Sequence, residues 1–209
     1  MQKYLVEFIG TFFLVLVIGL SVIEPGGAGA MAPLAIGATL MVMVYAGGHI
    51  SGGHYNPAVT LAVFMRGSCA AKDVAPYMIA QVLGGVIAAL LVGFNKSGAT
   101  VVAATPEVLK ALLNEALFTF ALCYVVLNTA TSSKNAGNSY YGLAIGFTVV
   151  AGAYAGGAIS GGAYNPAVAC GITVMGSSAV GNIWIFLVGN FAGGALAAMV
   201  YKMVNPGEK

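Results

Sequence analysis

The chain has very little charge for its length. Only 7% of its 209 residues are charged, whereas 59% are hydrophobic, and a soluble domain carries about 25% charged residues. The eight basic and six acidic side chains are scattered singly, so there is no basic patch for nucleic acid and no acidic tail. The composition therefore predicts a membrane protein that binds no nucleic acid.

Cysteine and histidine are also scarce. The three cysteines are far apart in the sequence and lack metal-ligand spacing, so they indicate neither a disulfide framework nor a zinc site. The two histidines are too few for a metal site. No nucleophile lies beside a general base in any motif. We therefore expect no metal, no cofactor and no enzymatic activity.

Long apolar runs fill most of the sequence instead. A membrane-spanning helix needs about 20 apolar residues, and runs of this kind are separated here by clusters rich in Gly, Pro, Asn and Ser. Six such spans would use nearly the whole chain, so we expect residues 1–209 to form a single domain. The predicted spans lie at 4–23, 31–48, 73–94, 107–130, 140–156 and 180–203.

One polar sequence motif, called the phrase below, occurs twice. "HISGGHYNPAVT" (His49–Thr60) and "AISGGAYNPAVA" (Ala158–Ala169) lie 109 residues apart, and the tetrapeptide LAIG recurs at the same offset. With three spans in each half, the second half must enter the membrane from the opposite side. The sequence therefore predicts inverted repeats at approximately 1–105 and 106–209.

Each phrase predicts a short helix that begins inside the membrane. Asn is a strong N-cap and Pro is favoured at the first helical position, so Asn56-Pro57 and Asn165-Pro166 each indicate a helix start. The apolar residues that follow suffice for about 16 Å, roughly half of a hydrocarbon core. We expect the preceding strings, Ser51-Gly52-Gly53 and Ser160-Gly161-Gly162, to be extended backbone that lines a water-filled path.

The predicted half-helices would meet at their N-termini near the midplane. Each N-terminus brings about +0.5 charge from the helix dipole, and Asn56 and Asn165 add amide donors. The glycine strings add unpaired carbonyl groups. Such a path favours neutral solutes that form hydrogen bonds and opposes cations, including hydronium.

The paired Asn-Pro-Ala boxes carry a family resemblance. Together with "GHISGGHYNPAVT", with "AQVLGG" in the third span and with a Glu in the first and fourth spans, they resemble the aquaporin, or major intrinsic protein, family over essentially the entire chain. The resemblance implies an all-α membrane protein with six transmembrane helices, two re-entrant half-helices in inverted repeats, a pore in each protomer and a homotetramer. The boxes are formed by Asn56, Pro57, Ala58, Asn165, Pro166 and Ala167.

Four polar residues are expected to support the re-entrant loops. Glu7 and Glu115 are intramembrane carboxylates, which are costly unless they are hydrogen-bonded inside the bundle, and in the family such glutamates bind backbone groups of the re-entrant loops. His49 and His54 flank the first glycine string. We expect one histidine to hold this loop and the other to touch the pore mouth. The alternatives are a proton relay through the glutamates and a pH gate at a histidine.

One position departs from the family pattern. Most members have arginine after the second box, in a ring that narrows the pore, but here that residue is Val168. Gap-free counting places Ile36, Ala153 and Gly162 at the other ring positions. The predicted selectivity filter is therefore wide and almost wholly apolar, without the charge and five donors of arginine. The alternative is that Val168 only packs and that another residue narrows the pore.

These observations predict a passive channel for water and for small neutral solutes such as ammonia, urea, hydrogen peroxide and glycerol. Valine at this ring position is similar to some plant vacuolar members of the family, which pass solutes besides water. Ala169 stands where glycerol facilitators usually have Asp, so a dedicated glycerol channel is not indicated. Three alternatives stay open: a channel for one non-water solute, a closed-pore structural or junction protein, and a secondary transporter.

Residues near the span ends predict the orientation. Positive residues gather on the cytoplasmic side, which favours cytoplasmic N- and C-termini in a cell (inner or plasma) membrane. This orientation places Lys96 and Lys110 outside and the larger group inside: Lys3, Arg66, Lys72, Lys134, Lys202 and Lys209.

Two further residue classes support the spans. Paired glycines in the third and sixth spans would let helices approach closely. Aromatic rings near span ends are expected at the membrane interface; they are Tyr4, Tyr77, Tyr140, Tyr141, Trp184 and Tyr201.

Overall fold

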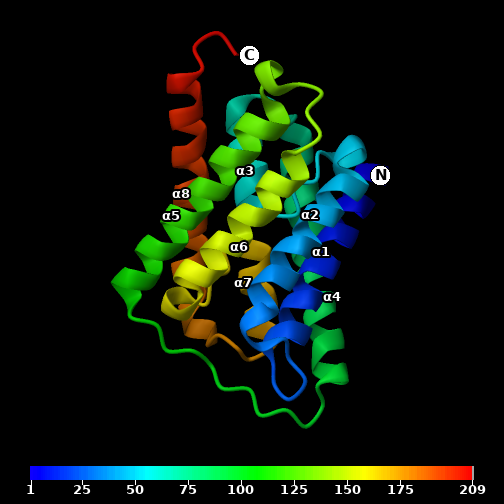
Figure 1. The fold of residues 1–209 in the computed structure, drawn as a ribbon, viewed down its shortest axis with the longest axis vertical. Coiled ribbons are helices and arrows are strands. Elements are labelled where there is room, and N and C mark those ends of the chain that lie inside the picture. The colour runs from blue at the N-terminus through cyan, green and yellow to red at the C-terminus, as the bar shows by residue number, and fades with distance from the viewer. Residues whose placement is uncertain (209) are drawn as a thin grey trace.

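The computed structural model describes residues 1–208 as a bundle of helices whose two termini lie at the same end (Figure 1). Within these residues, six helices are long and apolar enough to cross a membrane. They confirm the six predicted spans, with ends that differ by a few residues. They are α1 (Gln2–Val22), α2 (Ala32–Ser51), α4 (Ala71–Asn95), α5 (Val108–Val126), α6 (Tyr141–Ser160) and α8 (Ile183–Val204).

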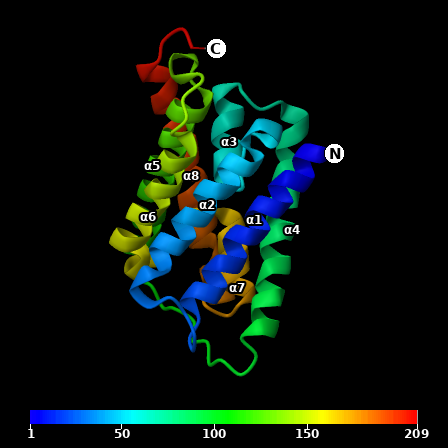
Figure 2. The same cartoon turned by 45° about the vertical axis from the view of Figure 1, so that its right-hand side comes forward.

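Two short helices, α3 (Pro57–Arg66) and α7 (Pro166–Val174), lie between the long ones (Figure 2). They are the two predicted half-helices, since about ten residues span only about 15 Å. α3 packs against α8 of the second half, and α7 packs against α4 of the first half. The two halves of the chain therefore interlock through their short helices.

Short irregular elements connect the helices at both ends of the bundle. The longest connection runs from α4 to α5 across the end opposite the termini (Figure 1). A bridge between Ala104 and Ser178 fastens this connection to the segment that follows α7. The remaining elements are η1 (Gly29–Met31), η2 (Leu127–Thr131, a π-helical turn), η3 (Ser133–Asn135) and η4 (Val180–Asn182).

Glycines let the long helices touch the backbone of the Asn-Pro-Ala boxes, as the paired glycines in the sequence predict. A Cβ atom at Gly85 would lie 2.8 Å from the carbonyl oxygen of Ala167. At the matching place in the second half, a Cβ at Gly194 would lie 2.7 Å from the carbonyl oxygen of Ala58. Any larger residue would push α4 or α8 away from the pore centre.

The backbone before each half-helix differs from the extended strings expected from sequence. Ser51 and Ser160 still belong to α2 and α6. Gly52 and Gly161 then end these helices in the left-handed region, with φ angles of 92° and 95°. The N–H of Gly52 donates to the carbonyl of Gly48 at 2.9 Å, which is how a left-handed glycine closes a helix. A helix end and a sharp turn therefore replace the extended segment.

Two aromatic residues expected at the membrane interface are buried instead. Tyr77 is 4% exposed and Tyr201 is 1% exposed. The hydroxyl of Tyr77 donates to the carbonyl oxygen of Ser51 at 2.7 Å, and the ring of Tyr201 lies 5.3 Å from the guanidinium carbon of Arg66. Both side chains have polar partners inside the bundle, so their polar groups are satisfied without contact with the membrane interface.

Candidate functional site

Asn56 and Asn165 cap the two half-helices. The Oδ1 atom of Asn56 accepts from the backbone N–H of Ala58 at 2.8 Å, and the Oδ1 atom of Asn165 accepts from Ala167 at 2.9 Å. Both helices then begin with proline, whose missing N–H needs no partner at that position. Local sequence alone therefore explains where each half-helix starts.

The side-chain amides of these two asparagines also cross-brace the loops. Nδ2 of Asn56 donates to the carbonyl oxygen of Tyr164 at 2.9 Å, and Nδ2 of Asn165 donates to the carbonyl oxygen of Tyr55 at 2.9 Å. Tyr55 and Tyr164 have positive φ angles of 50° and 48°, which are uncommon for large residues. Each loop therefore holds the other in a conformation that neither sequence favours locally.

A buried glutamate supports each loop. The carboxylate of Glu7 accepts hydrogen bonds from the Ser51 hydroxyl at 2.7 Å, the His54 N–H at 2.9 Å, the Tyr55 N–H at 2.6 Å and the Gln81 amide at 2.7 Å. Four donors fill both oxygens of the carboxylate, as expected for its ionised form. The loop groups that would otherwise lie unpaired at membrane depth are thereby satisfied.

Glu115 repeats this arrangement in the second half. Its carboxylate accepts from the Ser160 hydroxyl at 2.6 Å, the Ala163 N–H at 3.0 Å, the Tyr164 N–H at 2.7 Å and the Asn190 amide at 2.7 Å. The structure thus brings both glutamates to the backbone of the loops, where the family resemblance implies that they act.

The amides of Gln81 and Asn190 are supporting residues that the sequence reasoning missed. Each donates to a glutamate and also to a threonine hydroxyl, Gln81 to Thr60 at 2.9 Å and Asn190 to Thr119 at 3.0 Å. Both are fully buried. The available signal was a polar residue at the same place in two aligned spans, three residues before the paired glycines.

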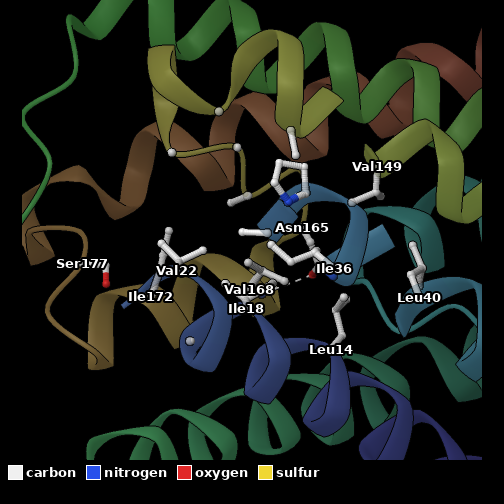
Figure 3. A pocket seen from close by; sticks show the side chains of 18 of the residues that line it. Leu14, Ile18, Val22, Ile36, Leu40, Val149, Asn165, Val168, Ile172 and Ser177 are labelled. Atoms are coloured by element: carbon white, nitrogen blue, oxygen red, sulfur yellow. Dashed lines mark hydrogen bonds between the residues drawn. The ribbon is translucent and has the colours of Figure 1, made fainter. Parts of the chain in front are cut away.

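A cavity of about 490 Å³ opens at the end opposite the termini and reaches the asparagine pair (Figure 3). Its walls are mainly aliphatic, and Figure 3 shows Val168, Ile36 and Ile18 facing it together with Asn165. Of the residues in the α4–α5 connection, Thr100, Val101, Val102 and Ala104 also line it. All four residues predicted for the filter line this one cavity: Ile36, Ala153, Gly162 and Val168.

A second cavity, of about 540 Å³, opens at the end that carries the termini. Its rim is more polar and includes Lys3 and Asp73, which form an ion pair. His49 is exposed and lines this cavity, whereas His54 is 7% exposed and its Nδ1 atom lies 3.1 Å from the Thr60 hydroxyl. His54 is thus tied to the loop and His49 lies at the mouth.

Comparison with known proteins decides the family. The profile described as "Major intrinsic protein" matches residues 1–201. The chain belongs to the major intrinsic protein family. Members of this family are passive channels and not enzymes, so the protein is a multi-pass membrane channel for water and small solutes.

Relatives of this family member come from plants and bacteria. The chain is 36% identical to Aquaporin TIP1-2 of Zea mays, over 97% of the chain and 85% of the relative. It is 41% identical to Aquaporin TIP1-1 of Arabidopsis thaliana, over 78% and 67%. It is 35% identical to Glycerol uptake facilitator protein-like 6 of Lactiplantibacillus plantarum, over 98% of both chains.

A solved structure supports the fold of this family member. The aquaglyceroporin from Plasmodium falciparum superposes with a TM-score of 0.80 at 20% sequence identity, covering 97% of this chain and 96% of the other. At this identity the likeness concerns the fold alone. It agrees with the six spans and two half-helices described above.

Proposed function

We propose that this channel passes water together with larger neutral solutes, namely ammonia, urea, hydrogen peroxide and glycerol, through a pore in each protomer. The proposed filter consists of Ile36, Ala153, Gly162 and Val168. The observation that carries this proposal is the continuity of the cavity opposite the termini, which runs from its mouth past Val168 to Asn56 and Asn165.

The chemistry of the lining agrees with neutral permeants. Among the described residues that line this cavity, none is a lysine or an arginine. The acidic residue of the lining is Glu24, which lies at the mouth. An arginine at position 168 would add a fixed charge and five donors. With valine in its place, the ring supports passage of solutes wider than water, and the helix dipoles at the midplane still oppose cations.

The asparagine pair supplies hydrogen bonds at the centre of the pore. One N–H of each Nδ2 atom is used on the opposite loop, to Tyr164 or to Tyr55. The second N–H of each amide has no partner in the described residues and is available to a passing solute oxygen or nitrogen. A neutral solute can therefore replace its hydrogen bonds to water with hydrogen bonds from these two N–H donors. A cation needs oxygen ligands, so the N–H donors cannot replace its bound water.

The test is a solute panel in proteoliposomes. Stopped-flow light scattering would measure permeability to water, urea and glycerol for the wild type and for Val168→Arg. We expect Val168→Arg to lower urea and glycerol permeability at least about tenfold while water flux falls much less, because the charge and the longer side chain narrow the ring. Val168→Leu is the matched control, since it adds bulk without charge.

The outcomes separate the open alternatives. A wild type that conducts water but excludes every larger solute contradicts the wide filter. Passage of one solute without water would indicate a channel specialised for that solute. Equal shrinkage of loaded and empty vesicles would indicate the closed-pore structural protein.

We also propose a homotetramer in a cell (inner or plasma) membrane with both termini in the cytoplasm, built from inverted repeats at approximately 1–105 and 106–209. The excess of basic residues at the end that carries the termini supports this orientation. Lys209, which the sequence also predicts on the cytoplasmic side, lies outside the described residues. Chemical cross-linking in membranes tests the tetramer, and reaction of a single introduced cysteine with a membrane-impermeant reagent tests the orientation.

A further inference from the structure

Asn114 is a buried amide that lines neither cavity. It lies on α5 directly before Glu115 and is 7% exposed. Its Nδ2 atom lies 3.0 Å from the carbonyl oxygen of Gly156, 2.7 Å from Oγ of Ser160 and 3.3 Å from the hydroxyl oxygen of Tyr164. Gly156 and Ser160 belong to the last turns of α6, and Tyr164 belongs to the loop before α7. One side chain of α5 therefore joins α6 to this loop.

The three partners decide which end of the amide faces them. A backbone carbonyl can only accept a hydrogen bond. The Ser160 hydroxyl gives its hydrogen to the carboxylate of Glu115 at 2.6 Å, so its oxygen can only accept from Asn114. The Tyr164 hydroxyl gives its hydrogen to the carbonyl oxygen of Gly152 at 2.8 Å, which leaves its oxygen as an acceptor as well. A flipped amide would place its oxygen against acceptors alone.

Both hydroxyls that Asn114 holds are linked to residues of the proposed filter. The Oγ atom of Ser160 accepts from the backbone N–H of Gly162 at 3.1 Å. The Tyr164 hydroxyl is bonded to the residue directly before Ala153. It also packs beside Gly162, since a Cβ atom there would lie 3.4 Å from its oxygen. The position of Gly162 relative to Ala153 therefore depends on these two hydroxyls.

The first half of the chain has an apolar residue at the matching place. Val6 directly precedes the loop-supporting glutamate of α1, as Asn114 precedes that of α5. Tyr55 keeps the hydrogen bond from its hydroxyl to α2, at 2.9 Å from the carbonyl oxygen of Met43, but Val6 has no polar group to donate. Of the two loops, the extra brace is found in the one that carries Gly162, on the side of the proposed filter.

We propose that Asn114 is a positioning residue for the filter, and that it fixes the distance between Gly162 and Ala153 and so the width of the ring. This inference rests on the proposed function, because it assumes that these residues form the ring. Asn114 touches no permeant and acts through Ser160 and Tyr164. Solutes close to the size of the ring depend most on its width, whereas water is smaller and depends on it less.

Transport through a variant of this residue tests the proposal. Asn114→Val gives the second half the residue of the first and removes the brace. We expect the ratio of glycerol to water permeability in proteoliposomes to rise about threefold or more, because the ring is no longer held at one width. Val6→Ala is the matched control: it loosens the corresponding place in the first half and should leave this ratio unchanged.

A double-mutant cycle tests whether Asn114 acts through Tyr164. Tyr164→Phe removes the hydroxyl that accepts from Asn114 and donates to Gly152, so it should raise the same permeability ratio. The double variant should raise it less than the two single effects combined, because both substitutions break one network. Independent effects that multiply would overturn the route through Tyr164. Tyr164→Phe also carries the transport test if Asn114→Val fails to fold.

Amide hydrogen exchange tests the brace without transport. The Gly162 N–H should exchange about fivefold faster in Asn114→Val, as expected when one hydrogen bond that holds its partner Ser160 is lost. NMR of the protein in detergent micelles gives this rate residue by residue. The N–H of Gly53, which donates to Oγ of Ser51 at 3.1 Å, is the internal control in the first loop and should keep its rate.

The failures of the two proposals are distinguishable. A wild type that passes water but no larger solute overturns the proposed function, while exchange at Gly162 still reports the brace. A conducting wild type whose permeability ratio is unchanged in both Asn114→Val and Tyr164→Phe overturns the positioning role alone. An unchanged exchange rate at Gly162 in Asn114→Val overturns the brace itself.

Discussion

The guanidinium of Arg66 lies 2.9 Å from the carboxylate of Glu208, and both side chains are at least 95% buried. Arg66 ends the half-helix α3, and Glu208 lies beyond the end of α8. Arg66 also donates to the Thr131 carbonyl at 3.1 Å, at the end of η2. The contacts tie a half-helix, the C-terminal segment and the wall of the adjacent cavity into one cluster.

Glu208 makes this cluster sensitive to acid. Hydrogen bonds from the Ser133 hydroxyl and N–H, and from the Ser132 and Tyr201 hydroxyls, lower the pKa of Glu208 to about 2 from its ordinary value of 4.5. Because the folded pKa is the lower one, the stabilisation is fully present above about pH 4.5 and is lost as the pH falls towards 2.

We therefore expect wild type to melt at a higher temperature than Glu208→Gln at pH 6, with a difference that shrinks between about pH 4.5 and 2. Thermal unfolding of both proteins in detergent across this range provides the measurement. A difference that stays constant with pH would show that the charge of Glu208 contributes nothing to stability.

The loop-supporting glutamates should be intolerant of neutral replacement. Glu7→Gln and Glu115→Gln each place an NH₂ group among four donors that converge on a carboxylate. The unpaired donors should cost at least about 2 kcal/mol of unfolding free energy. Glu107→Gln is the control, because Glu107 is exposed and its ion pair with Lys110 is worth little. Thermal unfolding that is equal for all three variants would be inconsistent with this role.

The asparagine cross-brace should contribute to stability beyond simple capping. Asn165→Ala removes a cap worth about 1 kcal/mol and a buried hydrogen bond to Tyr55 worth about another. We expect Asn56→Ala to behave in the same way, through Tyr164. Asn95→Ala, whose amide bonds an exposed helix end, is the comparison. Loss of only the capping energy in a chemical unfolding experiment would argue against the brace.

Close helix packing at Gly84 predicts opposite effects for two alanine substitutions on α4. A Cβ at Gly84 would lie 2.5 Å from the carbonyl oxygen of Phe8, whereas a Cβ at Gly93 would meet nothing within 4 Å. Gly84→Ala should therefore destabilise by about 1–3 kcal/mol. Gly93→Ala should stabilise by up to about 1 kcal/mol through helix propensity. Similar shifts for both variants in thermal unfolding would show that α1 and α4 adjust without cost.

Local signals in the sequence were sufficient for much of the fold. Runs of apolar residues predicted six spans, and Asn-Pro followed by apolar residues predicted α3 and α7, because capping and span length depend on neighbouring residues. The burial of Tyr77 was missed, since a tyrosine near a span end satisfies the interface rule until a partner such as the Ser51 carbonyl is known. Ser51 was predicted to be extended because it precedes two glycines. It is helical because the left-handed glycine that ends α2 is the next residue, Gly52.

The sequence by itself determined the membrane setting and the duplicated half-helices, because each depends on composition or on short spacing. Only the tertiary structure decided which donors fill the Glu7 carboxylate, that Nδ1 of His54 lies beside the Thr60 hydroxyl, and that Arg66 pairs with Glu208, 142 positions away. The physical reason is that hydrogen bonds and pore walls need contact in space, and distant segments reach such contact only when the two halves interlock.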